Sequence, residues 1–322
     1  MRKYSVIIPV YNRPDEIDEL LESLCHQTYT HFEVLVVEDG SSEKCDHLIP
    51  KYEKQLDLQY FYKENTGQGF SRNFGFERAK GDYFVVFDSD CLIPKHYFDT
   101  VDKFLDQYPF DAFGGPDRAH KNFTSLQKAM SYAMTSFFTT GGIRGKKKGV
   151  GNFQPRSFNM AVSRKVFQKT GGFRLRDMGE DIEWSMRINQ AGFKVGLISG
   201  AYVYHKRRTN LKAFFKQIFS FGQTRIRRKK YMPGGIKVVH LLPAFFVLAL
   251  LFYFLMPLLS IPLFKLGTLL LIFYCLAILL DATFQWKSLK IGVLSLVTSF
   301  VQLTAYGLGF LYEMFFGLKE DS

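Results

Sequence analysis

The sequence predicts an α/β domain with a mostly parallel sheet in its first two thirds, followed by helices that span a membrane. Three observations support this fold class. Short apolar stretches alternate with helix-period stretches over residues 5–90, acidic side chains stand at the ends of two of these apolar stretches, and long stretches without any charge follow residue 240. Parallel sheets covered on both faces have continuous apolar strands of this kind.

Four apolar stretches between residues 5 and 90 predict strands: SVIIPVYN, FEVLVVEDGS, LQYFYKEN and DYFVVFDSD. The stretch RPDEIDELLESLCHQT places Ile17, Leu20, Leu21 and Leu24 on one helical face, which predicts an amphipathic helix. GQGFSRNFGFERAKG predicts a second helix, entered and closed by glycine. Because ligands of such sheets bind beyond the carboxyl ends of the strands, the acids at the strand ends become candidate site residues.

The stretch from residue 94 to about residue 204 predicts a helix around 95–107, a helix near 124–138 and a helix in GEDIEWSMRINQAGFKVG. The last of these opens with Glu180 and Asp181, and a helix N-terminus lowers the pKa of a carboxylate there. Such a group stays ionised but is a weaker base. The glycine-flanked basic loop IRGKKKGVGN is expected to be mobile, and closure over a diphosphate, contact with lipid headgroups and simple solvation remain open.

The net charge of +12 is concentrated in one part of the chain. Residues 201–237 contain 11 Lys and Arg and no Asp or Glu, directly before the apolar region. A basic belt beside a membrane segment indicates an anchor on anionic lipid rather than a nucleic-acid site.

Three membrane spans are predicted at roughly 239–258, 260–281 and 290–313, although two spans with a re-entrant segment stay open. Before them, LKAFFKQIFSFGQ predicts a helix in the plane of the membrane interface, with an ordinary packed helix as the alternative. The predicted organisation is a catalytic domain at 1–208, a basic amphipathic helix and linker at 209–236, and a membrane region at 237–316.

The four cysteines show no Cys-x-x-Cys pair, which argues against a disulfide framework and fits a reduced cytosolic setting. The apolar stretch near the N-terminus is too short for a signal peptide and predicts a first buried strand.

Asp88 and Asp90 leave the fourth predicted strand one residue apart, either as a solvated loop tip or as half of a metal site. Two carboxylates in this position can present oxygens to Mg²⁺ or Mn²⁺ together with a substrate's phosphates. The tripeptide alone is a weak signal. It becomes specific when the other parts of a nucleotide-sugar site accompany it.

Those parts are present, and the chain resembles the family 2 glycosyltransferases, whose catalytic domain has the nucleotide-sugar-binding fold called GT-A. The resemblance covers about residues 3–205 and rests on four motifs in order: SVIIPVYNRPDEIDELLESLCHQTY, FEVLVVEDGSSE, NTGQGFSRNFGFERAKGDYFVVFDSD and GGFRLRDMGEDIEWSMRINQAGF.

The resemblance implies a role for each of ten residues. Those expected to border the nucleotide sugar are Pro9, Tyr11, Asp39, Arg72, Asn73 and Asp88, with Asp39 holding the base. Those expected to hold a Mg²⁺ or Mn²⁺ ion are Asp88, Asp90 and His205. The pair Glu180 and Asp181 is expected to supply the catalytic base, with Asp181 preferred.

The required chemistry explains why acids should stand on two sides of the site. A nucleoside diphosphate leaves readily only if its developing charge is neutralised, which a divalent cation achieves. The acceptor hydroxyl needs a carboxylate to take its proton as it attacks. A base across the sugar from the leaving phosphate gives inversion, and Asp90 and Asp181 belong to different predicted elements.

We therefore expect an inverting glycosyltransferase at the inner or plasma membrane, with its catalytic domain in the cytoplasm. Its donor would be a UDP- or GDP-sugar, and its acceptor a lipid-linked or other saccharide used in surface polysaccharide or glycolipid synthesis. A processive synthase is an alternative, although FGQTRIRRKK lacks the Trp of the Gln-x-x-Arg-Trp motif. An inactive membrane scaffold is the third alternative.

Overall fold

The computed structural model describes residues 1–141, 153–227, 236 and 238–317. The predicted basic loop at 143–152 lies outside this range. The described residues fall into two compact units, one from Met1–His120 with Lys147–Lys206, and one from Lys121–Lys146 with Arg207–Ser322. The sequence-based boundaries follow chain order, whereas the second unit takes in a segment from the middle of the chain.

The first unit is built on a seven-stranded sheet of order β3-β2-β1-β4-β8-β6-β9. Strands β3, β2, β1 and β4 are parallel, β8 is antiparallel to both of its neighbours, and β9 is parallel to β6. This mostly parallel sheet confirms the predicted fold class. The strands are β1 Tyr4–Val10, β2 Phe32–Asp39, β3 Asp57–Lys63, β4 Tyr83–Phe87, β6 Ala112–Gly114, β8 Asn159–Ser163 and β9 Val195–Leu197.

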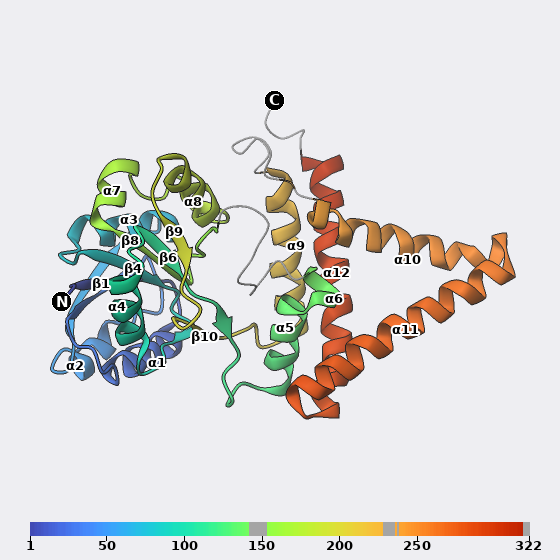
Figure 1. The fold of residues 1–322 in the computed structure, drawn as a ribbon, viewed down its shortest axis with the longest axis horizontal. Helices are drawn as coiled ribbons and strands as arrows, with labels where there is room; N and C mark the ends of the chain where they lie inside the picture. The colour runs from blue at the N-terminus through green and yellow to red at the C-terminus, as the bar shows by residue number, and fades with distance from the viewer. Residues whose placement is uncertain (142–152, 228–235, 237, 318–322) are drawn as a thin grey trace. The chain divides into compact units, whose positions relative to one another are not determined.

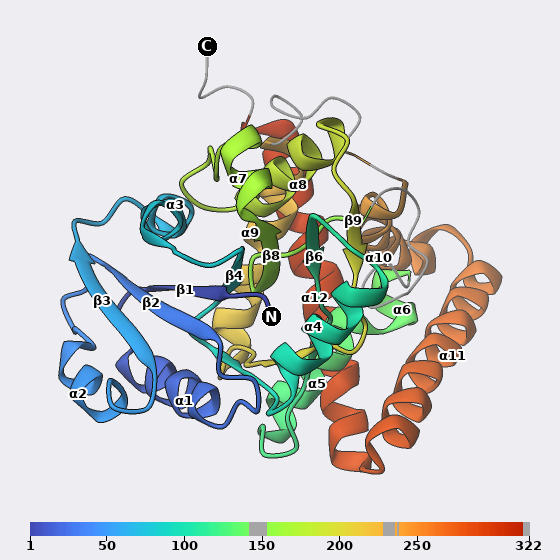
Figure 2. The same ribbon diagram turned by 60° about the vertical axis from the view of Figure 1, so that its left-hand side comes forward.

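Helices cover both faces of this sheet (Figure 2). On one face lie α1 Pro14–Cys25, α2 Ile49–Tyr52 and α4 Tyr97–Gln107, which share a core with alternate residues of β1 and β2 such as Val6 and Val34. On the other face lie α3 Gln68–Arg78, α7 Arg164–Thr170 and α8 Glu180–Gln190, packed on Ile7, Phe84 and Val86. Burial on both faces explains why the strands contain so few polar residues.

A second, three-stranded sheet of order β5-β10-β7 lies in the same unit. Its strands are β5 Cys91–Leu92, β7 Asp117–Arg118 and β10 Val203–His205. Strand β10 is antiparallel to β5, with His205 opposite Cys91. This pairing brings the predicted histidine beside the segment that follows β4, although His205 and Cys91 are 114 positions apart in the sequence.

The second unit is helical (Figure 1). Its helices are α5 Ser125–Thr135, α6 Phe137–Thr140, α9 Leu211–Arg227, α10 Leu242–Leu259, α11 Ile261–Trp286 and α12 Leu289–Phe315. Helices α10, α11 and α12 are each long and apolar enough to cross a membrane. The break between α10 and α11 falls at Ser260, whose side chain accepts a hydrogen bond from the Leu263 N–H and so caps α11.

The apolar face of α9 is covered by protein. Phe214 and Ile218 are buried against Met130 and Met134 of α5 and Ala305 of α12. This is the packed-helix alternative that the sequence left open. Helix α5 likewise packs on α12, which explains why the compact units do not follow chain order.

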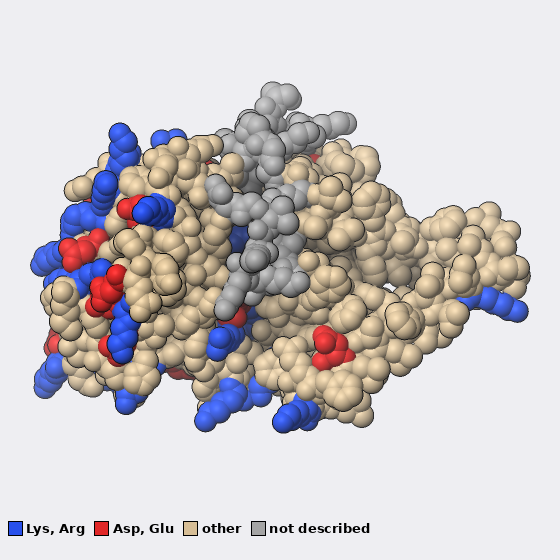
Figure 3. All heavy atoms as spheres, viewed as in Figure 1, with Lys and Arg blue, Asp and Glu red and all other residues tan. Residues whose placement is uncertain are grey.

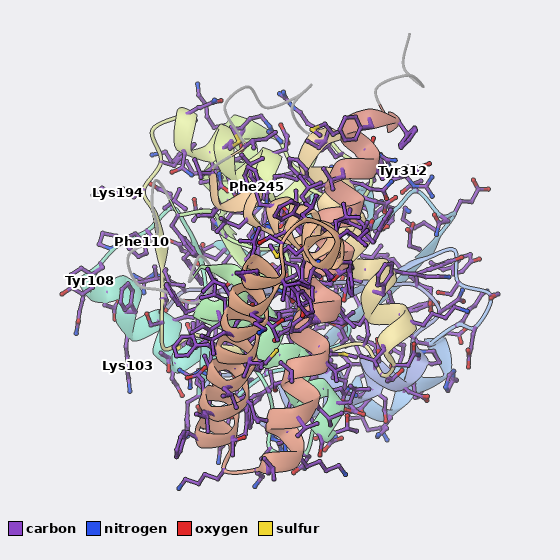
Figure 4. All side chains as sticks on the ribbon, turned by 90° about the vertical axis from the view of Figure 1, so that its right-hand side faces the viewer. Lys103, Tyr108, Phe110, Lys194, Phe245 and Tyr312 are labelled. Atoms are coloured by element: carbon purple, nitrogen blue, oxygen red, sulfur yellow. The ribbon has the colours of Figure 1, made fainter. Side chains whose placement is uncertain are left out.

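Helices α10 and α11 present mostly apolar side chains to their surroundings, and Figure 3 shows few charged atoms over them. Figure 4 labels two exposed residues of the second unit, Phe245 on α10 and Tyr312 on α12. A surface of this kind suits contact with lipid rather than water.

Candidate active site

The carboxyl ends of β1, β2 and β4 lie at one edge of the large sheet because these strands are parallel and in register. Pro9 lies opposite Val37 within β1, and Tyr11 follows that strand with its side chain exposed. Asp39 ends β2 and Asp88 directly follows β4. The structure therefore gathers these predicted residues at a single edge, as expected for a ligand site in such a sheet.

Asp39 is buried, and both of its carboxylate oxygens accept hydrogen bonds. It pairs with the ammonium of Lys63 at 2.5 Å and accepts hydrogen bonds from the N–H groups of Thr66 at 2.9 Å and Gly67 at 2.8 Å. Burial alone would raise the pKa of Asp39, but the hydrogen bonds from Lys63 and Thr66 outweigh it and place the pKa below its ordinary value. Gly67 has φ +91°, a conformation that only glycine adopts without strain.

Arg72 is the central buried cation of the site. Its side chain is completely inaccessible, and its two terminal nitrogens lie 2.8 Å from Asp88 and 2.8 Å from Glu180. Gln68, one turn earlier on α3, donates to the same Glu180 oxygen at 3.1 Å. One guanidinium therefore joins the end of β4 to the start of α8, and so links the two sets of acids that the sequence predicted.

Glu180 differs from the expectation for a carboxylate at a helix N-terminus. Burial raises the pKa of Glu180, and the neighbouring Asp181 raises it further, while Arg72 offsets only part of this effect. Burial outweighs the helix terminus because the side chain is almost completely removed from water.

Asp181, the preferred base, has a separate environment. One of its oxygens accepts a hydrogen bond from the Ile182 N–H at 2.7 Å, and the other lies 3.4 Å from the Ser157 N–H and 3.6 Å from the Arg156 guanidinium. These contacts to the second oxygen are long.

Asp90 and His205 lie together, as predicted for a metal site. The Nε2 atom of His205 is 3.0 Å from Oδ1 of Asp90, and the imidazole stacks on Phe158 with ring centroids 5.0 Å apart. The other oxygen of Asp90 lies 3.1 Å from the guanidinium of Arg13, which also contacts Glu16 at 2.7 Å. Asp88, the third predicted ligand, pairs through one oxygen with Arg72 at 2.8 Å.

Cys91 also lies within this group, because its sulfur, an Asp90 oxygen and a His205 nitrogen are all within 4.8 Å of one another. Burial raises the pKa of the Cys91 thiol well above its usual value, so the sulfur stays protonated. The groups that could bind a divalent cation are therefore the carboxylate, which suits Mg²⁺ or Mn²⁺, and the imidazole, which is a ligand of transition metals.

Asn73 occupies a different place from the other predicted residues. Its amide nitrogen donates to the Phe173 carbonyl at 2.7 Å, and its amide oxygen accepts from the Phe173 N–H at 2.8 Å. These contacts fix the chain that leads into α8.

Sequence reasoning did not single out Arg13, Lys63, Gln68 or Arg156, each of which contacts a predicted acid. Gln68 stands four residues before Arg72 in the same predicted helix, so the shared helical face could have identified it. The other three contacts join separate elements, and no spacing in the sequence indicates them.

The model of glycosyl transferase family 2 matches residues 5–171. An uncharacterized glycosyltransferase of Rickettsia bellii is 40% identical over 108 residues, which cover 34% of this chain and 16% of that protein. The poly(ribitol-phosphate) β-N-acetylglucosaminyltransferase TarS of Staphylococcus aureus is 36% identical over 115 residues, covering 34% of this chain and 20% of that protein. The matches thus span a fifth or less of these relatives.

Among solved structures, the mannosyltransferase PcManGT from Pyrobaculum calidifontis, in complex with GDP-Man and Mn²⁺, has a TM-score of 0.63 at 20% identity, covering 92% of this chain and 87% of that one. TarS 1–349 of S. aureus in complex with UDP-GlcNAc has a TM-score of 0.50 at 18% identity, covering 97% of this chain and 91% of that one. Both likenesses concern the fold.

Proposed function

Because this chain belongs to glycosyl transferase family 2, we propose that it transfers a sugar from a nucleotide-sugar donor to a hydroxyl of a membrane-associated, lipid-linked saccharide. The observation that carries this proposal is the arrangement of two acid sets in one unit. Asp90 with His205 forms one set, Glu180 with Asp181 forms the other, and Arg72 links the second set to Asp88 at the end of β4.

The donor's nucleoside would lie at the ends of β1 and β2. The ring of Tyr11, which is 53% exposed, can stack on a base, while Asp39 is held in its ionised form by Lys63 and can accept a hydrogen bond. Arg72 and Asn73 contribute to the nucleotide site mainly by positioning other groups. Arg72 holds the side chain of Asp88, and Asn73 holds the backbone of Phe173.

Asp90 and His205 fit a Mg²⁺ or Mn²⁺ ion, because one carboxylate oxygen and one imidazole nitrogen converge within 3.0 Å. An ion bound there would neutralise the charge that develops on the diphosphate as it leaves. The guanidinium of Arg13, at the same carboxylate, adds a fixed positive charge on this side of the site.

Asp181 is the base in this proposal. As the acceptor oxygen forms its bond to the anomeric carbon, its proton passes to Asp181, and the bond from that carbon to the phosphate oxygen breaks with its electron pair on the diphosphate. Attack from the face opposite the leaving group inverts the anomeric configuration. Glu180 is less suited to this task because Arg72 and Gln68 both occupy one of its oxygens.

The membrane context follows from the apolar helices and the basic residues. Helices α10 and α11 supply the lipid contact, and the basic belt at 201–237 favours the cytoplasmic face, where nucleotide sugars are made. In the processive alternative, Gln223 of FGQTRIRRKK would belong to the synthase motif; in this structure its amide nitrogen donates to Glu313 at 3.1 Å.

The test is release of nucleoside diphosphate by the purified full chain in lipid nanodiscs with Mn²⁺. Related structures were solved with UDP-GlcNAc and GDP-Man, so UDP- and GDP-sugars are the first donors to try, with and without a polyprenyl-linked acceptor. We expect Asp90→Ala and Asp181→Asn to lower turnover by at least 100-fold, and the surface variant Asp106→Asn to retain it. Unchanged turnover in both site variants would overturn the assignment.

A further inference from the structure

The three helices that could cross a membrane differ sharply in how far protein covers them. In their most apolar windows, 17% of α10 and 6% of α11 is buried, against 50% of α12. Helix α12 is therefore covered by protein along half of its apolar window, whereas α10 and α11 are mostly exposed. The residues on the covered side of α12 indicate whether that helix lies in lipid.

Polar residues line the covered side of α12. Thr298 is fully buried and donates to the Ala129 carbonyl of α5 at 2.9 Å. Glu313 is nearly fully buried and pairs with Arg227 of α9 at 2.7 Å. Carboxylates and guanidinium groups are among the costliest side chains to place in hydrocarbon. The ion pair therefore indicates that this end of α12 packs against α9 outside the hydrocarbon layer.

Helix α9 runs beside α12 in the same direction. Ile218 packs with Ala305, and further along both helices Arg227 meets Glu313. The backbones touch at Gly222, where an added Cβ would lie 2.2 Å from the Tyr306 carbonyl oxygen. Close helix contact of this length fixes the depth of α9 relative to α12.

That depth decides whether α12 can cross a bilayer. Lys216 is exposed and lies between Phe214 and Ile218, which pack level with the middle of α12. If α12 spanned the membrane, Lys216 would sit near the centre of the hydrocarbon and the exposed Lys212 one turn away. Insertion scales put the cost at about 2.5–3.5 kcal/mol for each lysine at that depth.

Helices α10 and α11 have the opposite character. Their exposed residues include Phe254, Leu258 and Phe273, and near their shared tip the two helices contact each other through the hydroxyls of Tyr253 and Thr268 at 3.0 Å. The 18 residues of α10 extend about 27 Å, close to the thickness of the hydrocarbon layer.

The ends of this hairpin rest on α12 at two separate levels (Figure 1). Pro243 at the start of α10 meets Gly307, and Thr283 near the end of α11 meets Gly292. Helix α12 thus forms the base from which the hairpin projects.

We propose that α10 and α11 form a membrane-inserted hairpin, and that α12 lies along the membrane surface with α5 and α9 instead of crossing it. The chain then crosses the bilayer twice, and its C-terminal end stays on the same side as α9. The exposed apolar side chains of α12, such as Val293, Val297 and Leu308, face the interfacial layer of the lipid. This proposal concerns the second unit alone and does not depend on the proposed transfer reaction.

The first test uses single cysteines in the full chain, with the four native cysteines replaced. Lys212→Cys marks the side of α9, a cysteine appended after Ser322 marks the C-terminus, and Ser260→Cys marks the hairpin tip. We expect a membrane-impermeant maleimide to label Lys212→Cys and the C-terminal cysteine from one side of sealed vesicles, and Ser260→Cys only from the other. Labelling of the C-terminal cysteine from the side opposite to Lys212→Cys would overturn the proposal, as would a tip that is protected from both sides.

The second test leaves the native cysteines in place, because Cys45 and Cys91 are buried and their replacement could impair folding. Fluorescent protein and alkaline phosphatase are each fused after Ser322 of the unmodified chain. With α9 on the cytoplasmic side, as the basic belt at 201–237 indicates, two crossings predict fluorescence without phosphatase activity. A chain with three crossings gives the reverse result, which contradicts the proposal whatever the activity of the enzyme.

Discussion

Arg72 offers the sharpest test of how the site is held together. Its side chain is completely buried and contacts Asp88 and Glu180 at 2.8 Å each. Replacing it with methionine keeps much of the volume but removes the charge, which leaves the buried Glu180 beside Asp181 with no cation in contact. Removing one partner of a buried ion pair typically costs about 3–5 kcal/mol.

This cost is a large part of the stability of an ordinary domain, which is about 5–15 kcal/mol. The matched control is Arg78→Met on the same helix, because Arg78 is 38% exposed and lies 3.7 Å from Glu77. A surface pair of that kind is worth about 0–1 kcal/mol. We therefore expect Arg72→Met to be destabilised by several kcal/mol relative to Arg78→Met.

The chain provides its own probe for this measurement. Of its two tryptophans, Trp184 is fully buried in the core beside the site and Trp286 lies on α11. In a Trp286→Phe background, Trp184 fluorescence reports unfolding of the first unit in urea. Adding Glu180→Gln to Arg72→Met should recover part of the lost free energy, because it removes the uncompensated charge. A cost for Arg72→Met no greater than that for Arg78→Met would refute the reasoning.

Three further predictions follow from the same contacts. Arg13→Met should strengthen Mn²⁺ binding without nucleotide by about tenfold, since it removes a positive charge 3.1 Å from Asp90; calorimetry showing equal or weaker binding would contradict this. The pKa of Asp39 is lower in the folded protein than in the unfolded chain, where it is about 4, so ionised Asp39 stabilises the fold at neutral pH. This stabilisation is lost as the pH falls through the folded-state pKa. The difference in melting temperature between wild type and Asp39→Asn should therefore shrink between pH 6 and pH 3. A constant difference would show that Asp39 does not titrate in this way. Gly222→Leu should separate α9 from α12 and lower the melting temperature in detergent, whereas Gly171→Leu, in open space, can be costly only through its positive φ.

The sequence predicted the elements well wherever a regular pattern was strong. The spacing of Ile17, Leu20, Leu21 and Leu24 predicted α1, and all four are buried. The continuous apolar strands predicted a parallel sheet, and the strand-end acids lie at its edge because parallel strands share that edge.

Other features depend on contacts between distant residues, which a local pattern does not contain. Arg72 links Asp88 to Glu180, and Arg72 and Glu180 are 108 positions apart in the sequence. The raised pKa of Glu180 reflects burial, whereas its position in the sequence showed only a helix start. The covered face of α9 looked suited to lipid because amphipathic periodicity does not distinguish a lipid surface from a protein surface.

The packing of α5 on α12 has a consequence for synthesis of the chain. The bond from Thr298 to Ala129 joins residues 169 positions apart, so α5 leaves the ribosome long before its partner exists. At about 5–20 residues per second the interval is roughly 8–34 s. During that time Met130 and Met134, which are buried in the finished protein, need another cover. An early association of α5 with the membrane surface or with a chaperone would supply it, and nascent chains halted before residue 289 should show that association.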